Sequence, residues 1–258
     1  MIPSPPERAA ASVAVDNSRT NRYAHARLTT WLSGIILAIS WVWVAQPAWR
    51  QTSFAMHPWA VGDWVINLQG GPVRRGILGE ILYSTGVTAD QAAQVVIGLQ
   101  LILLAGLYVT CFLLFLGTTR SPAWMMLLLS PAFLLFPLLS FEGGLRKELL
   151  TLVALSLLGL LVANRRGAIW ILPPFVLYSV AVAGHETAAL MLPAFLFLLW
   201  FGYSQGTLGR RALRMWAASF SLAAGAALAW AVAFPGTQDR VQAVCDSWLA
   251  RGAPLEAC

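Results

Sequence analysis

The residues best suited to chemistry fall in three short clusters, each close to the predicted end of an apolar segment. Arginine and lysine bind phosphate groups, arginine through paired hydrogen bonds and lysine as a point charge. A carboxylate or an imidazole can take the proton of a hydroxyl group. Together the clusters hold the groups needed to bind a phosphate and to activate an alcohol. Their members are Asp63, Arg74, Arg75 and Glu80; Glu142, Arg146, Lys147 and Glu148; and His185 and Glu186.

Two of these clusters place cations where a helix is predicted to begin. After Pro72, apolar residues recur at helical spacing, which predicts a short amphipathic helix at the membrane surface. The turn that contains Arg146 and Lys147 opens another predicted helix. Because the N-terminus of a helix is already positive, cations there reduce stability unless an anion lies nearby. We therefore expect these arginines and Lys147 to serve a shared anionic ligand at the expense of the fold.

Each cluster also has an ordinary explanation, which the sequence leaves open. Arg74 and Arg75 are also suited to binding lipid head groups at the interface. In the second cluster, the basic and acidic side chains can neutralise one another in a solvated turn. His185 and Glu186 can be simple turn residues, and Asp63 an ordinary loop acid. Intramembrane or interfacial ionisable groups are nevertheless often functional, and the four features share one predicted side of the protein.

Familiar catalytic and metal-binding motifs are absent from the sequence. His185-Glu186 begins like a zinc-protease motif, but the position for its second histidine is Ala189. The sequence has no P-loop, no dinucleotide-binding glycine pattern and no nucleophile elbow. The cysteines Cys111, Cys245 and Cys258 have no metal-binding spacing. No metal site is predicted; a divalent cation between Asp63 and a bound phosphate is compatible with these residues but is not required by them.

The amino-acid composition indicates the structural class of the protein that contains these clusters. Of 258 residues, 58% are hydrophobic and only 11% are charged, and the mean hydropathy is +0.68. A soluble protein carries about 25% charged residues. The sequence thus predicts an all-α integral membrane protein with about seven transmembrane helices. The predicted spans are 29–48, 93–117, 123–140, 148–164, 168–184, 187–203 and 216–234.

The charge distribution predicts how the chain is oriented. The expected regions are a cytoplasmic tail (1–28), a transmembrane domain (29–235) with an external loop (49–92), and an external C-terminal segment (236–258). With the N-terminus inside, cytoplasmic segments hold ten basic residues and external segments hold seven. This excess on the cytoplasmic side agrees with the positive-inside rule. The net charge of +6 is explained by this bias, and no pattern typical of nucleic-acid binding is present. Cys245 and Cys258 then lie outside, where we expect them to form a disulfide.

The residue pattern resembles bacterial membrane proteins of surface-polysaccharide assembly: GT-C-type lipid-linked glycosyltransferases and O-antigen or capsule polymerases. The resemblance rests on Asp63 in the first external loop, the Gly70–Gly76 string with Gly79-Glu80, Arg146-Lys147-Glu148 and His185-Glu186. It implies location in the bacterial cytoplasmic membrane. Members of this group have eight or more spans, so the chain is expected to be a short member or a truncated one.

The resemblance implies sugar transfer from a polyprenyl-phosphate or polyprenyl-diphosphate carrier. Arg74, Arg75, Arg146, Lys147 and His185 would bind the phosphates. Asp63 would be the catalytic base, with Glu186 or Glu80 as alternatives. The expected partners are the polyprenyl-linked sugar, membrane lipid and other polysaccharide-assembly proteins. The alternative is a non-enzymatic transporter, flippase or assembly subunit that binds a lipid-linked anion.

Overall fold

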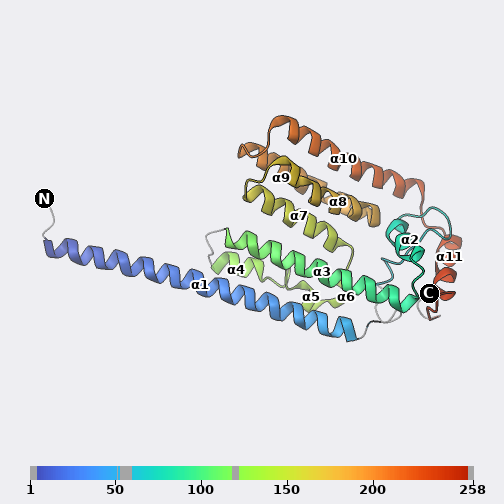
Figure 1. Ribbon diagram of the computed structural model, residues 1–258, viewed down its shortest axis with the longest axis horizontal. Helices are drawn as coiled ribbons and strands as arrows, with labels where there is room; N and C mark the ends of the chain where they lie inside the picture. Colours follow the sequence, from blue (N-terminus) through green and yellow to red (C-terminus); the bar gives the residue numbers. More distant parts are fainter. Residues whose placement is uncertain (1–4, 51, 53–59, 118–121, 255–258) are drawn as a thin grey trace.

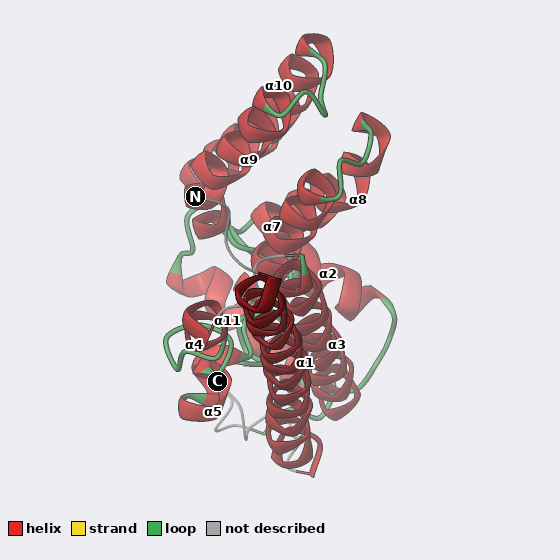
Figure 2. Ribbon diagram, turned by 90° about the vertical axis from the view of Figure 1, so that its left-hand side faces the viewer, coloured by secondary structure: helices red, strands yellow, loops and turns green. Residues whose placement is uncertain are grey.

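The computed structural model describes residues 5–50, 52, 60–117 and 122–254, and within those ranges it contains helices and loops but no strands (Figures 1 and 2). Four segments form helices long and apolar enough to cross a membrane: Arg27–Arg50, Ala89–Leu116, Glu186–Ser204 and Arg210–Ala233. The first lies within α1 (Pro5–Arg50), and the others are α3 (Ala89–Leu116), η2 with α9 (Glu186–Met191 and Leu192–Ser204) and α10 (Arg210–Ala233). The all-helical, membrane-type fold expected from composition is therefore confirmed.

Two further predicted spans are helical but shorter. They are α7 (Glu148–Ala163) and the combined segment η1 (Ala168–Ile171) with α8 (Leu172–Gly184). At 1.5 Å per residue, the 16 residues of α7 extend over about 24 Å, which is less than the roughly 30 Å of a hydrocarbon core.

The segment 123–140 differs from the prediction of one continuous helix. It forms α4 (Pro122–Leu128), a series of turns, and the single-turn helix α5 (Phe136–Leu139), followed by α6 (Phe141–Gly144). Pro131 follows the end of α4 and Pro137 lies in the first turn of α5. Neither residue has an N–H, and a proline ring clashes with the preceding turn of a helix. The chain consequently turns instead of continuing, with Leu135 N–H bonded to Ser130 O at 3.3 Å.

Helix α7 lies at the centre of the packing. It contacts α3 on one side and α8 and α9 on the other; α1 packs against α3, and α10 against α8 and α9 (Figure 1). Most of the buried apolar side chains belong to these interfaces. The resulting bundle has two ends that differ in chemistry.

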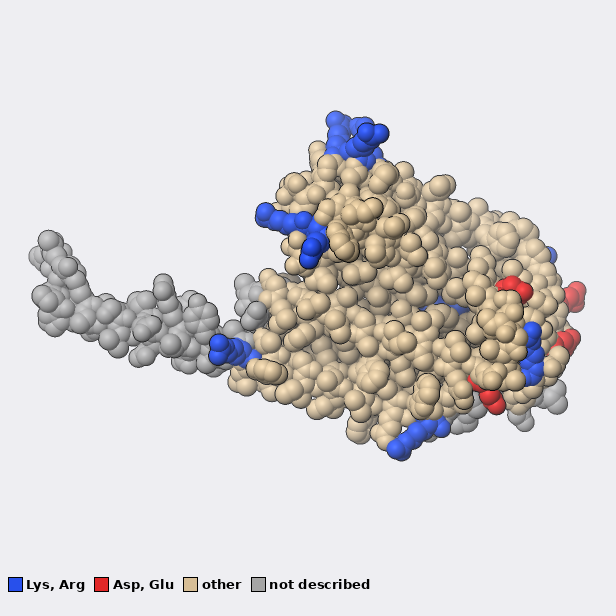
Figure 3. All heavy atoms as spheres, viewed as in Figure 1, with Lys and Arg blue, Asp and Glu red and all other residues tan. Residues whose placement is uncertain are grey.

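On the face shown in Figure 3, acidic groups are confined to one end of the bundle, the end that carries α2 and α11 in Figure 1. At the opposite end the visible charges are basic. The connections 164–167 and 205–209 lie there. The first contains Arg165 and Arg166, and the second is followed by Arg210, Arg211 and Arg214 at the start of α10.

Two small helices cover the acidic end. The helix predicted after Pro72 is α2 (Gly76–Ser84), and α11 (Gln238–Leu249) lies beside it (Figure 1). The indole N–H of Trp248, which is buried, donates to Val65 O at 2.8 Å and thereby fixes α11 against the loop before α2. Cys245 lies on α11 and forms no disulfide with any described residue. Its predicted partner Cys258 is outside the described residues, so that pairing stays a prediction.

Candidate functional site

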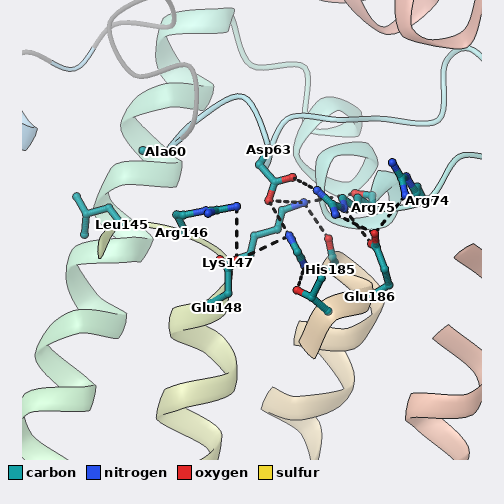
Figure 4. A network of polar contacts seen from close by, with 12 residues as sticks. Ala60, Asp63, Arg74, Arg75, Leu145, Arg146, Lys147, Glu148, His185 and Glu186 are labelled. Carbon is teal, nitrogen blue, oxygen red and sulfur yellow. Dashed lines mark hydrogen bonds and ion pairs between the residues drawn. The ribbon is translucent and has the colours of Figure 1, made fainter. Parts of the chain in front are cut away.

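The three clusters, which together extend over more than a hundred residues of sequence, converge at the end of the bundle that carries α2. Asp63 comes from the loop before α2, Arg74 and Arg75 immediately precede α2, Lys147 and Glu148 lie at the start of α7, and His185 and Glu186 join α8 to η2 (Figure 4). We refer to Asp63, Arg74, Arg75, Arg146, Lys147, Glu148, His185 and Glu186 as the charged cluster.

Arg75 is the centre of the charged cluster. Its guanidinium donates to both carboxylate oxygens of Glu186, at 2.9 and 2.8 Å, and lies 3.4 Å from Asp63 Oδ1. The hydrogen bonds to Glu186 are the main reason that the pKa of Arg75 is raised. Arg75 has φ +65°, in the left-handed region, a conformation that costs a non-glycine residue about 1–2 kcal/mol. This backbone conformation ends the preceding loop, begins α2 and holds the guanidinium toward both acids.

Lys147 is buried completely, which is rare for a lysine. Its ammonium donates to Gly184 O at 3.0 Å and lies 3.9 Å from Asp63 Oδ2. Burial lowers the pKa of Lys147 to about 8, although the charge of Asp63 acts in the opposite direction. Lys147 therefore joins the starts of α7 and η2 and supplies an internal positive charge.

His185 lies between two carboxylates. Its Nε2 is 3.9 Å from Asp63 Oδ2 and 3.9 Å from Glu148 Oε1, while Nδ1 is hydrogen-bonded to Thr187 Oγ1. Burial, followed by the positive charge of Arg75, lowers the pKa of His185. The imidazole is thus held mainly neutral with one nitrogen facing both acids.

The remaining predicted residues divide into members and non-members of the charged cluster. Arg74 is half-exposed and reaches Glu186 at 3.5 Å, and Arg146 pairs with Glu148 at 3.5 Å. Glu80 lies elsewhere: its carboxylate accepts from the backbone N–H of Leu68 and from the amide of Gln69. Glu80 therefore stabilises the loop before α2, and the geometry does not favour it as an alternative base.

The idea that the four cations oppose the fold needs correction. We expected Arg74, Arg75, Arg146 and Lys147 to serve an anionic ligand at the expense of the fold. Instead, three carboxylates (Asp63, Glu148 and Glu186) face them. Arg146 pairs with Glu148 within its own cluster, which the sequence had left open as an alternative. The pairs of Arg75 with Glu186 and of Lys147 with Asp63 join segments far apart in sequence, so these cations contribute to the fold. Four cations against three carboxylates still leave one positive charge, and the half-exposed Arg74 is the most accessible of the closely paired cations.

Two residues of the site were not identified as site residues from sequence. Glu148 was noted only as a neighbour of the basic pair. Gln100, buried in the middle of α3, donates its amide to Ala60 O at 2.7 Å and to Leu145 O at 3.0 Å. It thereby connects the segment before Asp63 to the segment before Arg146. The available signal was an amide within an apolar span, which needs a polar partner.

An apolar groove begins beside the charged cluster. It has a volume of about 330 Å³ and runs between α8 and α10. Arg74, Arg75 and Glu186 lie at one end, and small side chains line much of the rest, namely Ala183, Ala223, Ala226, Ala227 and Ala231. A second cavity of about 340 Å³, between the loop and α11, shares the same two arginines. The arginines thus stand between two apolar spaces.

The arrangement can bind an anion at Arg74 and Arg75 while an attached apolar chain occupies the groove. It also contains carboxylates and a neutral imidazole, which can accept a proton. Within the described residues, no group of three or more His, Cys, Asp or Glu side chains is arranged to hold a metal ion.

Comparison with known proteins adds no assignment. No protein-family model, no curated protein and no solved structure matches this chain.

Proposed function

We propose that the protein transfers a sugar from a polyprenyl-phosphate or polyprenyl-diphosphate carrier at the outer face of a bacterial cytoplasmic membrane. The observation that carries the proposal is the position of Arg74 and Arg75 at the mouth of the apolar groove. An amphiphile with an anionic head and a hydrocarbon chain matches both parts of that site. The arginines bind the phosphate, and they stabilise the charge that grows on it as the sugar leaves.

The groove supports a lipid-linked ligand in particular. Its alanine-lined walls offer room beside the helix backbones, and Arg74 and Arg75 belong to the same lining. A soluble nucleotide sugar has no chain to fill such a space. Apolar pockets with a few polar groups at one end are typical ligand sites.

Asp63 is the proposed base. It lies beside Arg75 and Lys147, which hold its carboxylate in place. In the reaction, the acceptor oxygen forms a bond to the sugar carbon, the carrier phosphate leaves with the electron pair, and Asp63 takes the hydroxyl proton. Glu186 is bound bidentately by Arg75, so its proposed role is to position the guanidinium.

The proposed orientation has seven membrane-crossing segments, with the N-terminus in the cytoplasm and the C-terminus outside. The basic end of the bundle would then face the cytoplasm, in agreement with the positive-inside rule. The shortness of α7 and the broken segment 123–140 would be accommodated within the bundle, where irregular backbone is tolerated. The charged cluster and α11 would face the outer leaflet.

The test is binding and transfer in proteoliposomes with a polyprenyl-phosphate-linked sugar as the probe. Ala227→Leu narrows the groove, whereas Ala229→Leu adds the same volume at an exposed α10 position outside its lining. We expect Ala227→Leu to weaken binding of the polyprenyl probe by about tenfold, equivalent to roughly 1.4 kcal/mol, with Ala229→Leu unchanged. Equal binding by both variants would refute the groove assignment.

A non-enzymatic lipid-binding subunit is the second candidate, favoured by the enclosure of Asp63. The side chain of Asp63 is only 11% exposed, which restricts access for an acceptor. Probe binding that depends on Ala227 and Arg74, without transfer to any acceptor supplied, would select this candidate.

A further inference from the structure

Four buried polar atoms of the charged cluster have no hydrogen-bond partner among the described residues: Asp63 Oδ2, Arg146 Nε, Glu148 Oε2 and His185 Nε2. Buried polar atoms are nearly always satisfied, so a group of unsatisfied ones calls for an explanation. Two of them, on Asp63 and His185, belong to side chains that are 11% and 4% exposed. They come from separate segments and meet at one place (Figure 4).

The distances between these groups are alike. His185 Nε2 is 3.9 Å from Asp63 Oδ2 and 3.9 Å from Glu148 Oε1, and Lys147 Nζ is also 3.9 Å from Asp63 Oδ2. Such separations are too long for direct hydrogen bonds. Two hydrogen bonds of about 2.8 Å that meet at an oxygen atom at roughly a right angle span about this distance. One water molecule can therefore connect the imidazole with either acid.

The two acids differ in their access to solvent. The side chain of Glu148 is 40% exposed, whereas those of Asp63 and His185 are almost fully enclosed. Asp63, His185 and Glu148 thus form a series that begins inside the cluster and ends at the aqueous surface. Glu148 is the only one of the three that is substantially open to bulk water.

We infer that Glu148 is the proton outlet of the site, receiving through the Nε2 atom of His185 the proton that Asp63 removes from a hydroxyl group. The identity of the hydroxyl as a sugar acceptor rests on the proposed function. The path itself rests on the positions of three side chains and on the unsatisfied atoms Asp63 Oδ2 and His185 Nε2. The Glu148 oxygen nearest to His185 is Oε1, which also pairs with Arg146.

The proton steps balance without any further reactant. The acceptor O–H bond breaks as its oxygen bonds to the sugar carbon, and Asp63 Oδ2 takes the proton. With Nδ1–H donated to Thr187, the lone pair on His185 Nε2 accepts that proton through one water molecule. The same nitrogen then gives the proton to Glu148, which releases it to solvent. Asp63 and His185 return to their starting states.

The surroundings of His185 favour transfer of the proton over its retention. Arg75 opposes a charge on the imidazole, while Asp63, Glu148 and Glu186 favour it. Burial opposes the charge most strongly, and the net result is a lowered pKa. The charged imidazolium form is consequently less favourable here than in water, which favours passing the proton on.

The test measures proton exchange at His185 in the full chain, reconstituted in lipid nanodiscs with ¹⁵N-labelled histidine. His185→Gln identifies the His185 signal among the three histidines. We expect Glu148→Gln to slow the exchange of protons between His185 Nε2 and water by about tenfold or more, as for the loss of a positioned proton-transfer group. Glu148→Asp, which keeps a carboxylate, should fall between Glu148→Gln and the wild type.

Asp239→Asn is the matched control, because Asp239 is an exposed acid on α11 at the same end of the molecule. It should leave exchange at His185 unchanged. Wild-type exchange in both Glu148 variants, or an equal loss in Asp239→Asn, would overturn the inference. If Glu148→Gln does not fold, Glu148→Asp decides: exchange at the wild-type rate or faster overturns the relay.

The sugar-transfer assay is read separately from the exchange experiment. A wild-type protein that transfers no sugar refutes the proposed function, and the exchange measurement still decides whether Glu148 is the outlet. If transfer occurs, Glu148→Gln should lower its rate and shift its pH profile without weakening binding of the polyprenyl probe.

Discussion

Arg75 combines a left-handed backbone conformation with ion pairs to two carboxylates. The backbone conformation is unfavourable for a side-chain-bearing residue, but the bidentate pair with Glu186 and the contact with Asp63 offset that cost. Arg74, its neighbour, has similar chemistry but is half-exposed and has one longer contact, at 3.5 Å. The two arginines therefore differ: Arg75 is held within the fold by its ion pairs, and Arg74 is the more accessible of the two to the proposed ligand.

Arg75→Gln should lower the free energy of unfolding by about 3 kcal/mol or somewhat less, because it leaves Glu186 and Asp63 without their main partner. Arg74→Gln should change it by no more than about 0.5 kcal/mol, as expected for an exposed side chain, while weakening binding of the polyprenyl-phosphate probe. Thermal and denaturant unfolding in detergent would measure the first effect. Equal stability of the two variants would mean that the Arg75 pair adds nothing to the fold.

Lys147 predicts a stability that depends on pH. Its pKa falls from 10.5 to about 8 on folding, so between these values the unfolded chain binds more protons than the folded one. The free energy of unfolding contributed by Lys147 then rises with pH across this window and is flat below about pH 8. We expect wild-type stability, relative to Lys147→Met, to increase from pH 8 toward pH 10. A difference that stays constant would show that the ammonium keeps its ordinary pKa.

At the scale of elements, close backbone contact holds α2 in place. A Cβ atom at Gly79 would lie 1.9 Å from Ile66 O, a backbone atom that cannot rotate away. At Gly184, a Cβ atom would meet the Leu78 side chain of α2 at 2.4 Å. These glycines allow α2 to approach both the loop that carries Asp63 and the end of α8. The position of Arg75 at the start of α2 depends on that approach.

Gly79→Ala should therefore displace α2 and destabilise the protein by about 1–3 kcal/mol, the range for an overpacked site. It should also reduce probe binding, because Arg74 and Arg75 move with α2. Gly225→Ala in α10 is the control, since nothing lies within 4 Å of its added Cβ. That variant should be unchanged or more stable by about 0.5–1 kcal/mol. Equal stability and equal probe binding of Gly79→Ala and Gly225→Ala would contradict this account.

At the scale of the whole molecule, the bundle has a basic end and an end where acids are found (Figure 3). The proposed orientation predicts the outcome of labelling with a membrane-impermeant thiol reagent. In a variant without the native cysteines, a cysteine at position 236, after α10, should react in intact cells. A cysteine at position 167, between α7 and α8, should react only after the membrane is permeabilised. The opposite pattern would reverse the proposed topology and place the charged cluster in the cytoplasm.

Sequence alone determined the helical, membrane-type fold, because long apolar runs and sparse charge are local properties of the chain. The length of such a run can be compared directly with the thickness of a bilayer. It also selected the residues of the charged cluster, since basic pairs at helix starts and a histidine–glutamate turn are unusual wherever they occur. It placed α2 correctly between the first two long helices. The disulfide, the seven spans and the orientation remain predictions from sequence.

Only the tertiary structure decided which charges neutralise one another. Glu186 is 111 residues from Arg75 in the chain, and its pairing with Arg75 depends on how α2 and α8 pack, which periodicity does not encode. The structure likewise placed Glu80 outside the charged cluster, showed Gln100 joining the segments beside it, placed Glu148 next to His185, and broke the segment 123–140 at its prolines. The sequence shows which residues are charged and with which sign. The partner of each charge depends on distances of a few ångströms that are set only when the chain folds.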